Sequence, residues 1–226
     1  MVRILKLVTS RTSSEPPIAG RRIRGLDATE RAQQRRELIL DTALELFARD
    51  GYANTSIETL CQTAFVGNKA FYENFTTKEA CYLELLQRNT NAIVAQVTTA
   101  VTDLPADEHV GTRHVISTLA AALLDDPRVA TVTFGQAAGI SPTIDRQRRA
   151  NRRQSAELVL AVWRHFGHTG DKTRQRMLAI AVIGGLFDLI SDALDRSDNS
   201  MSAAEVEQLI ADMTDFALVA SAGLRA

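Results

Sequence analysis

The sequence predicts an all-α protein of about nine helices, with an N-terminal three-helix unit of the helix-turn-helix type and a larger helical C-terminal domain. Beyond residue 30, apolar residues recur at spacings of three and four, which is the period of an amphipathic helix. No alternating pattern of useful strand length occurs. Proline, glycine and capping residues divide the periodic sequence into segments of ordinary helical length.

Residues 1–30 are predicted to form a flexible basic leader, because they lack helical periodicity and are rich in residues that break helices. These breakers are Ser13, Ser14, Pro16, Pro17, Gly20 and Gly25. Nine basic and three acidic residues give residues 1–36 a net charge of +6, although the whole chain carries −1. A basic arm beside a neutral body is expected where a protein contacts a polyanion. A misassigned start codon would also explain such a segment.

Four helices are predicted between residue 31 and about residue 100. The first helix ends before Gly51, and the second is capped by Thr55 or Ser56. The third runs from about Asn68 to Asn74, and the fourth starts near Thr77. The apolar residues of the first helix are Ile39, Ala43, Leu46 and Phe47, and those of the second are Ile57, Leu60, Cys61 and Ala64. The third helix has Phe71, and the fourth has Tyr82, Leu85, Leu86, Ile93 and Val97. Each set lies on one face of its helix.

Five more helices are predicted after a boundary near residues 100–107, which Pro105 marks. The fifth helix runs to about Leu124, the sixth from Pro127 to Ala138, and the seventh from Pro142 to about Phe166. The eighth runs from Asp171 to Arg196, and the ninth begins after the cap Ser202. The last two carry the stripes Ile183, Phe187, Ile190 and Leu194, and Val206, Leu209, Ile210, Met213, Phe216 and Ala217.

The start of the short third helix is polar. Apart from Val66, Ala70 and Phe71, the segment 64–72 offers little apolar surface, and Asn68 and Lys69 begin the helix. Asparagine pairs with adenine and lysine donates to guanine, so this face is suited to reading bases in a major groove. The residues at helix ends that are placed to hold phosphates are Thr55, Tyr72 and Lys78. Core packing explains most single amphipathic helices, but the combination favours DNA.

This part of the sequence resembles the N-terminal domain of the TetR family of bacterial transcriptional regulators. That family typically has a helix ending in Phe-x-x-x-Gly-Tyr, then Thr-Ser/Thr-Ile, then Ala-x-x-Ala-Gly-Val-Ser-x-Gly-x-Phe/Leu-Tyr-x-His-Phe, then Lys-Glu. The matching residues are Phe47, Gly51, Tyr52, Thr55, Ser56, Ile57, Ala64, Val66, Phe71, Tyr72, Phe75, Lys78 and Glu79. The resemblance is specific because of its length and spacing.

Three positions depart from the family pattern. Phe65 replaces the usual turn glycine, and because a non-glycine residue is disfavoured at positive φ, a locally altered turn is expected. Gly67 replaces the usual serine cap and removes a hydroxyl that could bind phosphate, and Asn74 replaces the usual histidine. These changes affect the expected contacts more than the expected fold.

The resemblance implies a DNA-binding domain at residues 31–80 and an effector-binding, dimerising domain at residues 81–226. We therefore expect a repressor that binds a palindromic operator in double-stranded DNA as a homodimer and is released by a small-molecule effector. The expected DNA-contacting residues are Thr55, Ser56, Gly67, Asn68, Lys69, Tyr72, Asn74 and Lys78. No catalytic residue, cofactor or metal ion is expected.

The C-terminal sequence supports a dimer independently. The last two predicted helices carry long apolar stripes, and Gly184 and Gly185 would let another backbone approach closely. Packing inside one chain is the alternative explanation of these stripes. The candidate ligand-binding residues are His114, Phe134, Gln136, Trp163, Phe166 and Phe187, together with Thr133. Aromatic residues of this kind more often fill an ordinary core.

Other clusters have simpler explanations. The predicted seventh helix carries a basic run of Arg146, Arg148, Arg149, Arg152 and Arg153, which usually means a solvated face; an acidic ligand or a second DNA contact is the alternative. His165 and His168 lack a third ligand, so a metal site is not expected. Cys61 and Cys81 fall at apolar positions and are expected to be reduced core thiols.

No segment approaches the ~18 apolar residues of a membrane span, and the apolar run at residues 4–8 is too short for a secretory signal. A cytoplasmic protein without a membrane partner is therefore expected. The alternatives to a ligand-responsive repressor are an architectural DNA-binding protein without an effector and, less favoured, a helical-bundle enzyme. For an enzyme, the sequence offers no phosphate loop, nucleophile elbow, metal-ligand set or catalytic triad.

Overall fold

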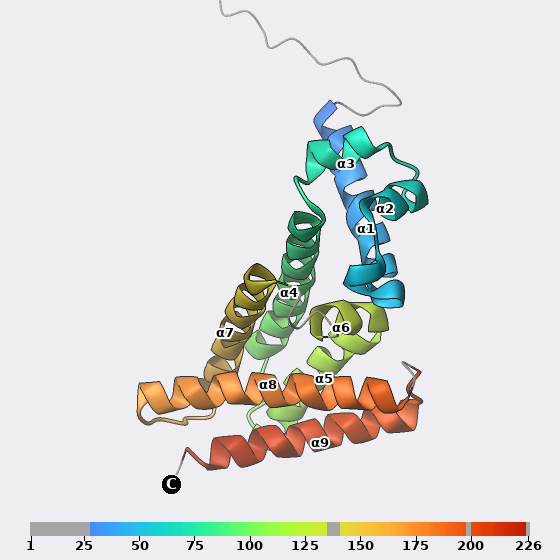
Figure 1. The fold of residues 1–226 in the computed structure, drawn as a ribbon. Coiled ribbons are helices and arrows are strands. Elements are labelled where there is room, and N and C mark those ends of the chain that lie inside the picture. Colours follow the sequence, from blue (N-terminus) through green and yellow to red (C-terminus); the bar gives the residue numbers. More distant parts are fainter. Residues whose placement is uncertain (1–27, 135–140, 198–199, 225–226) are drawn as a thin grey trace, which may run out of the picture.

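Residues 28–134, 141–197 and 200–224 are described by the computed structural model of the chain. These residues form nine helices and no strand, which confirms the predicted all-α fold (Figure 1). The helices are α1 (Ala28–Asn54), α2 (Ile57–Thr63), α3 (Asn68–Asn74), α4 (Lys78–Thr102), α5 (Glu108–Leu124), α6 (Pro127–Phe134), α7 (Pro142–His165), α8 (Lys172–Arg196) and α9 (Ala203–Ala222).

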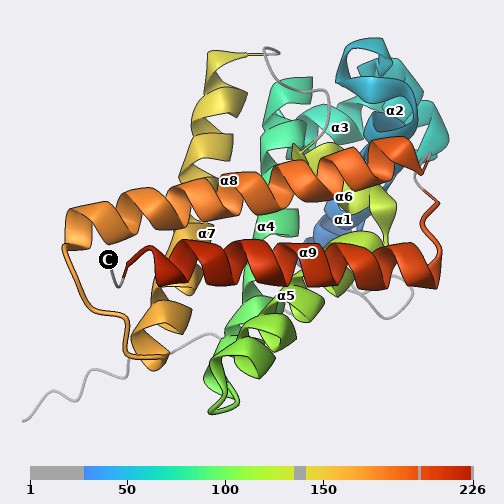
Figure 2. The ribbon, with the colours of Figure 1, turned by 90° about the horizontal axis from the view of Figure 1, so that it is seen from below.

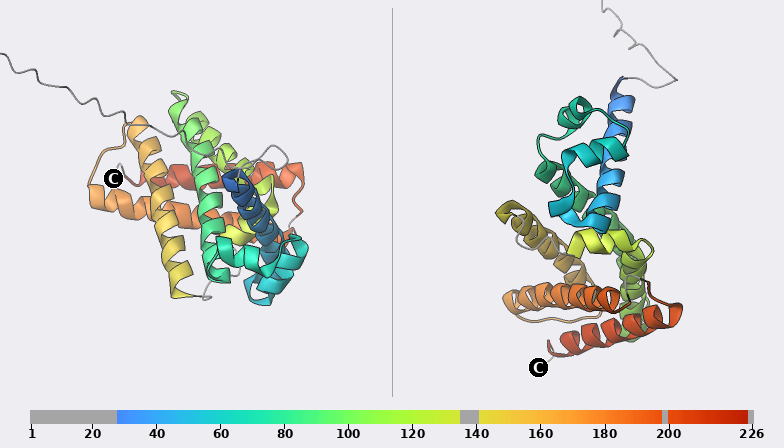
Figure 3. Two further views of the ribbon diagram at one scale, coloured as in Figure 1. Left: turned by 90° about the horizontal axis from the view of Figure 1, so that it is seen from above. Right: turned by 45° about the vertical axis from the view of Figure 1, so that its right-hand side comes forward.

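The described helices form an elongated molecule with two distinct ends (Figure 1). The helices α1, α2 and α3 gather at one end of the molecule, and α8 and α9 form a layer at the opposite end (Figure 1; Figure 3, right). The long helix α4 leads from the first group toward the second, and α7 packs beside it. Seen from below, α8 and α9 lie side by side across the molecule (Figure 2). The two ends of the fold therefore present different surfaces.

Local capping explains why the helix bounds follow the sequence closely. Six helices begin after a residue whose side-chain oxygen accepts a hydrogen bond from the backbone N–H three residues later, namely Ser56, Thr77, Asp107, Ser141, Asp171 and Ser202. Such a cap stabilises a helix by about 0.5–2 kcal/mol. Before α9, Glu205 completes a capping box by accepting from the backbone of Ser202.

The first helix ends where the sequence predicts. Gly51 interrupts α1 with a φ of +79° and a ψ of 160°, so the regular helix stops before the last few residues of the element. Glycine is suited to this left-handed φ because it has no Cβ. At its other end α1 already includes residues 28–30, which were expected to belong to the leader; residues 1–27 lie outside the described residues.

Two hydrophobic clusters hold the fold. The first joins α1, α2 and α3 to the beginning of α4, and it also includes Val132 of α6 and Ile144 of α7. The second occupies the space among α4, α5, α7, α8 and α9. Both cysteines are buried in the first cluster, where burial raises the pKa of Cys61 and raises the pKa of Cys81 to about 12. Their thiols are therefore protonated at neutral pH, as expected for core residues.

Among the described helices, α8 is long and apolar enough to cross a membrane by length and composition alone, which differs from the expectation from sequence. In the structure this helix packs against α7 and α9, and Ile183, Leu186 and Ile190 on its inner side are buried. Packing accounts for that inner side of α8. Met177, Ala181 and Gly184 of α8 lie on an outer face, which is described below.

Candidate DNA-binding surface and internal cavities

A single large side chain anchors the third helix. Phe71 is 0% exposed and is the only buried residue of α3, and its ring packs near Phe75 with a centroid separation of 5.7 Å. Because α3 spans only residues 68–74, one anchor fixes which face it turns outward. That outer face carries Gly67, Asn68, Lys69 and Tyr72, all of which are exposed. The helix α3 and its N-cap, which carry these four predicted residues, lie at the end of the molecule away from α8 and α9 (Figure 1).

The turn between α2 and α3 keeps a left-handed residue. Phe65 has a φ of +52°, so phenylalanine itself takes the conformation for which glycine is usual. The expected alteration of the turn is therefore wrong, and strain of roughly 1–2 kcal/mol is stored at this residue instead. The ring of Phe65 is 97% exposed. Gly67 caps α3 without a side-chain hydrogen bond, as its lack of a hydroxyl requires.

Arg36 of α1 fixes the other end of α3. Its Nη1 donates to the carbonyl oxygen of Asn74 at 2.8 Å, which satisfies a carbonyl at the end of the helix. Its Nε donates to Glu84 of α4 at 2.6 Å, and its Nη2 bonds the second oxygen of the same carboxylate. The guanidinium carbon lies 4.5 Å from the centroid of the Phe75 ring. Sequence reasoning missed this role because the partners are distant in the sequence.

Other predicted DNA-contacting residues have partners inside the protein. Thr55 is 1% exposed, and its hydroxyl donates to the carbonyl oxygen of Gly51 at 2.9 Å. The Nδ2 of Asn74 donates to the carbonyl oxygen of Ala70 at 2.7 Å. Ser56 is exposed but serves as the N-cap of α2. Of these three, only Ser56 is exposed.

Lys78 also points inward. Its Nζ donates to the carbonyl oxygens of Tyr52 and Thr55, each at 2.7 Å, and lies 4.2 Å from the centroid of the Tyr52 ring. Burial lowers the pKa of this ammonium group from its usual value. The ammonium therefore joins the end of α1 to the start of α4. We expect it to stabilise the domain more than to contact a phosphate.

Lys78→Ala should lower the free energy of unfolding by about 1–3 kcal/mol, because two carbonyl oxygens lose a charged donor. Urea unfolding followed by circular dichroism measures this. The matched control is Lys69→Ala, whose side chain is exposed and reaches only Glu73 at 3.8 Å, and it should change stability by less than about 0.5 kcal/mol. A Lys78→Ala protein of unchanged stability and a flatter salt dependence of DNA binding would assign Lys78 to phosphate contact after all.

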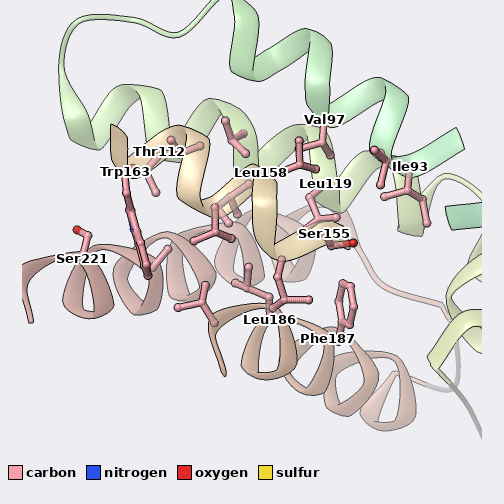
Figure 4. Close-up of a pocket in the computed structure, with 18 of the residues that line it drawn as sticks. Ile93, Val97, Thr112, Leu119, Ser155, Leu158, Trp163, Leu186, Phe187 and Ser221 are labelled. Atoms are coloured by element: carbon pink, nitrogen blue, oxygen red, sulfur yellow. The ribbon is translucent and has the colours of Figure 1, made fainter. Parts of the chain in front are cut away.

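The C-terminal half contains an apolar cavity of about 70 Å³. Its lining comes from α4, α5, α7, α8 and α9 and includes Trp163 and Phe187, both predicted ligand-binding residues. In Figure 4, Trp163 and Ser221 lie toward one end of the cavity, and Phe187 and Ser155 lie toward the other.

A second cavity, of about 80 Å³, adjoins the first and shares Ile93, Ser155 and Phe187 with it. This cavity is more polar, because Arg148, Asn151, Arg152, Asp188 and Ser191 line it together with Thr133. Phe134 lies here as well, and its ring stacks on that of Phe187 with a centroid separation of 4.1 Å. The basic run on α7 is thus divided: Arg148, which is half-buried, and Arg152, which is exposed, line this cavity, whereas the exposed Arg146, Arg149 and Arg153 line neither cavity.

The remaining predicted ligand-binding residues lie elsewhere. His114 is exposed on α5 and lines neither cavity. The ring of Phe166 packs over Gly111, where a Cβ atom would come within 2.6 Å of it. Gln136 lies outside the described residues. His165 is exposed, whereas the Nε2 of His168 is buried 2.6 Å from a carboxylate oxygen of Glu108, so these histidines do not form a common site.

The stripes that suggested a dimer are mostly buried within the chain. The buried residues include Ile183, Ile190, Leu209 and Met213, which all belong to the second hydrophobic cluster, called the C-terminal cluster from here on. A Cβ atom on Gly185 would lie 2.7 Å from the ring of Phe216, so this glycine admits a side chain of the same chain. Packing inside one chain therefore explains these buried residues, and a second copy would have to contact a set of residues of α8 and α9 that stay exposed, such as the outer side of Phe216.

Such a set exists on the outer side of the two helices. On α8, Met177, Ala181 and Gly184 are spaced i, i+4 and i+7 and share one face. Met177 is 63% exposed, Val219 of α9 is 73% exposed, and a Cβ atom on Gly184 would meet no neighbour within 4 Å. We call Met177, Ala181, Gly184, Phe216 and Val219 the outer α8–α9 face.

Comparison with known proteins connects these features to a family. A family model described as bacterial regulatory proteins, tetR family, matches residues 39–85, which include α2 and α3. The uncharacterized HTH-type transcriptional regulator YuxN of Bacillus subtilis (strain 168) is 39% identical over 54 residues. That match covers 24% of this chain and 19% of YuxN, so the chain matches about a fifth of the length of this curated relative.

Solved structures extend the similarity in fold to the C-terminal helices. PfmR, a TetR family transcriptional regulator from Thermus thermophilus, has a TM-score of 0.62 at 18% identity over 79% of this chain and 96% of that chain. The regulator FadR from Bacillus subtilis, solved in complex with stearoyl-CoA, has a TM-score of 0.68 at 16% identity over 83% and 98%. A putative transcriptional regulator from Pseudomonas aeruginosa PAO1 has a TM-score of 0.69 at 19% identity over 84% and 92%.

These findings agree with the geometry. The matched segment contains the exposed face of α3, and the similarity in fold covers most of the chain. Residues 39–85 thus match the TetR family of bacterial transcriptional regulators, and the all-helical fold that carries this segment is similar to that of a solved TetR family regulator.

Proposed function

We propose that this protein is a repressor that binds a palindromic operator as a homodimer and leaves it when a small molecule occupies the C-terminal cavities. The observation that carries the DNA-binding part is the outer face of α3, where Asn68, Lys69 and Tyr72 are exposed around the single anchor Phe71. An exposed helix start with amide and cationic side chains can hydrogen-bond to base edges in a major groove. The protein acts in this proposal by binding and not by catalysis.

Contacts to bases and to phosphates are expected from different residues. Asn68 and Lys69 are the proposed base-reading pair, and Gly67, Tyr72 and Ser56 flank them at exposed helix ends. Thr55, Asn74 and Lys78 support this surface from within through their backbone hydrogen bonds. The net charge of +6 over residues 1–36 would add attraction to the phosphate backbone.

Asn68→Ala and Lys69→Ala should each weaken operator binding by about 1–3 kcal/mol per lost base contact and relax the preference for particular operator bases. The measurement is fluorescence anisotropy on a set of operator variants, with the operator first selected by the purified protein from genomic fragments. Glu58→Ala on α2 is a control, because this side chain is exposed but lies outside the proposed reading pair. Unchanged base preference in both α3 variants would remove these residues from the reading face.

The effector part of the proposal is supported by the two cavities and by their link to the DNA-binding helices. The Nη2 of Arg148, which lines the second cavity, donates to the hydroxyl of Tyr82 and to the carbonyl oxygen of Val132, each at 3.1 Å. The ring of Tyr82 packs edge-on against Phe47 and Tyr52 of α1. A ligand that moves Arg148 would thus act on a side chain packed against α1, and differential binding of this kind shifts a conformational equilibrium.

A solved relative in fold also supports a ligand site, since FadR from Bacillus subtilis holds stearoyl-CoA. The competing proposal is an architectural DNA-binding protein without an effector, for which a filled C-terminal core would be expected; the two cavities favour the effector proposal. A gel-shift experiment on DNA upstream of the gene tests operator binding. Release of that DNA by a small molecule would distinguish a ligand-responsive repressor from the architectural protein.

A further inference from the structure

One face of α7 changes from cationic to apolar along its length. Arg148, Arg152 and Ser155 are spaced i, i+4 and i+7, and the next residues on this face, Leu158, Val162 and Trp163, line the apolar cavity. The same helix face therefore lines both cavities in sequence. From Arg152 to Trp163 it advances about 16 Å at the helical rise per residue. A molecule lying along this face would meet guanidinium groups at one end and hydrocarbon at the other.

We propose that the two cavities together bind a medium-chain carboxylic acid, with its carboxylate at Arg148 and Arg152 and its alkyl chain between α7 and α8. This inference rests on the proposed function only in that it uses the same C-terminal cavities as the effector site. The carboxylate is chosen because a guanidinium group presents a planar pair of donors that matches two carboxylate oxygens. The alkyl chain is chosen because the lining of the first cavity is predominantly apolar.

The sizes of the cavities set the length of the chain. With volumes of about 70 and 80 Å³ and roughly 10–15 Å³ for one water-sized group, each cavity holds about five to eight such groups. Together they hold about ten to fifteen, which corresponds to a carboxylic acid of about eight to thirteen carbons, because its two oxygens occupy two of these groups. A much longer chain would require the side chains around Phe187 and Trp163 to move apart.

The charges in the second cavity favour an anion. Arg152 makes no ion pair with any residue that the structure describes, and Arg148 lies one helical turn before it. Asp188 of α8 lines the same cavity and is exposed, so it opposes an anion there and would attract a cation. Two guanidinium groups against one carboxylate leave a net charge of +1. Asn151 is already satisfied, since it donates to Thr90 and accepts from Gln147.

The chain contains a natural fluorescence probe for ligand binding. Trp163 is the single tryptophan of the protein and lines the apolar cavity. The full-length protein is titrated with decanoate, decanol and decylammonium, which share one alkyl chain and differ in head-group charge. Tryptophan fluorescence and calorimetry follow binding. Decanoate should bind roughly tenfold or more tightly than decanol, and decylammonium should bind no better than decanol.

Two arginine variants on α7 distinguish binding inside the cavity from attraction to the positive charge of the whole helix. Arg152→Gln should weaken decanoate binding roughly ten- to a hundredfold and leave decanol binding nearly unchanged. Arg153→Gln, at the exposed neighbouring position, removes the same charge outside both cavities and should leave the binding of both ligands unchanged. Butyrate should bind much more weakly than decanoate, because it buries fewer methylene groups.

Three results would overturn the inference: equal binding of decanoate and decanol, equal effects of Arg152→Gln and Arg153→Gln, or no saturable heat below about 1 mM decanoate. Operator binding is measured separately on the same proteins. A protein that binds decanoate but never binds DNA would refute the proposed repressor and leave the cavity assignment standing. A protein that binds DNA but no carboxylate would refute the cavity assignment alone.

Discussion

Gly184→Arg should convert the proposed dimer into a monomer and weaken operator binding by roughly a hundredfold or more. Gly184 lies on the outer α8–α9 face, and beyond the backbone of its own helix and its two chain neighbours no atom lies within 4 Å of the position that its Cβ would take. Arginine is therefore tolerated within one chain, but it places a charge and a long side chain in the middle of an apolar contact between two chains. Two recognition helices must be joined to occupy two half-sites, and losing that connection removes about 10²–10⁴ in apparent affinity.

Light scattering at micromolar concentration measures the mass, and fluorescence anisotropy on the operator measures affinity. Circular dichroism checks that the variant is folded. Gln96→Arg is the matched control, because Gln96 is exposed on α4 and the substitution adds the same side chain away from the outer α8–α9 face. A wild-type protein that is monomeric while binding its operator normally would be incompatible with this assembly, and a dimeric Gly184→Arg protein would place the interface elsewhere.

Phe71→Ala should destabilise the DNA-binding helices by about 3–5 kcal/mol, the usual range for removing a fully buried phenylalanine ring. Phe71 is 0% exposed and is the only buried residue of α3, so no other side chain of this helix replaces its packing. Because a domain is stable by about 5–15 kcal/mol in total, this loss removes a large part of the stability that keeps α2 and α3 in place. Operator binding should then fall below detection.

The two clusters allow this loss to be located. Trp163 belongs to the C-terminal cluster, so its fluorescence reports unfolding there, whereas circular dichroism reports helices in both clusters. In Phe71→Ala, the circular dichroism signal should fall at lower urea concentration than the fluorescence signal. Phe71→Leu keeps a branched apolar side chain and should cost less, with partial operator binding retained. Coincident and unshifted transitions in Phe71→Ala would show that α3 does not depend on this anchor.

Local signals in the sequence were sufficient to predict the helices. The left-handed φ at Gly51 and the capping box of Ser202 and Glu205 depend on residues a few positions apart, so a pattern in the sequence contains both partners. The position of α3 was predicted for the same reason, with Asn68 and Asn74 as its bounds. Phe65 was the exception: its propensity argued for a changed turn, but the hydrogen bonds around it, such as Val66 N–H to the carbonyl oxygen of Cys61, hold the turn in place.

Amphipathic periodicity determined which faces of the helices are apolar, but the sequence by itself did not determine what each face meets. The stripe on α8 was consistent with a second copy, and only the tertiary structure decided that Ile183 and Ile190 fill the core of the same chain. A hydrophobic stripe gains the same free energy from either partner, so periodicity carries no information about which one is present.

The contact partners of charged and polar residues were likewise not determined by the sequence alone. Lys78 was expected at a phosphate because lysine at a helix end is usually solvated, but its ammonium meets carbonyl oxygens 23 and 26 residues earlier in the chain. Arg36 reaches Asn74 and Glu84, 38 and 48 residues away. Whether Arg148 and Arg152 line a cavity likewise depends on how α7 packs on α4 and α8. The sequence determined the helices and their apolar faces, whereas the tertiary structure decided the partners, because helix formation depends on near neighbours and side-chain contacts depend on residues that folding brings together.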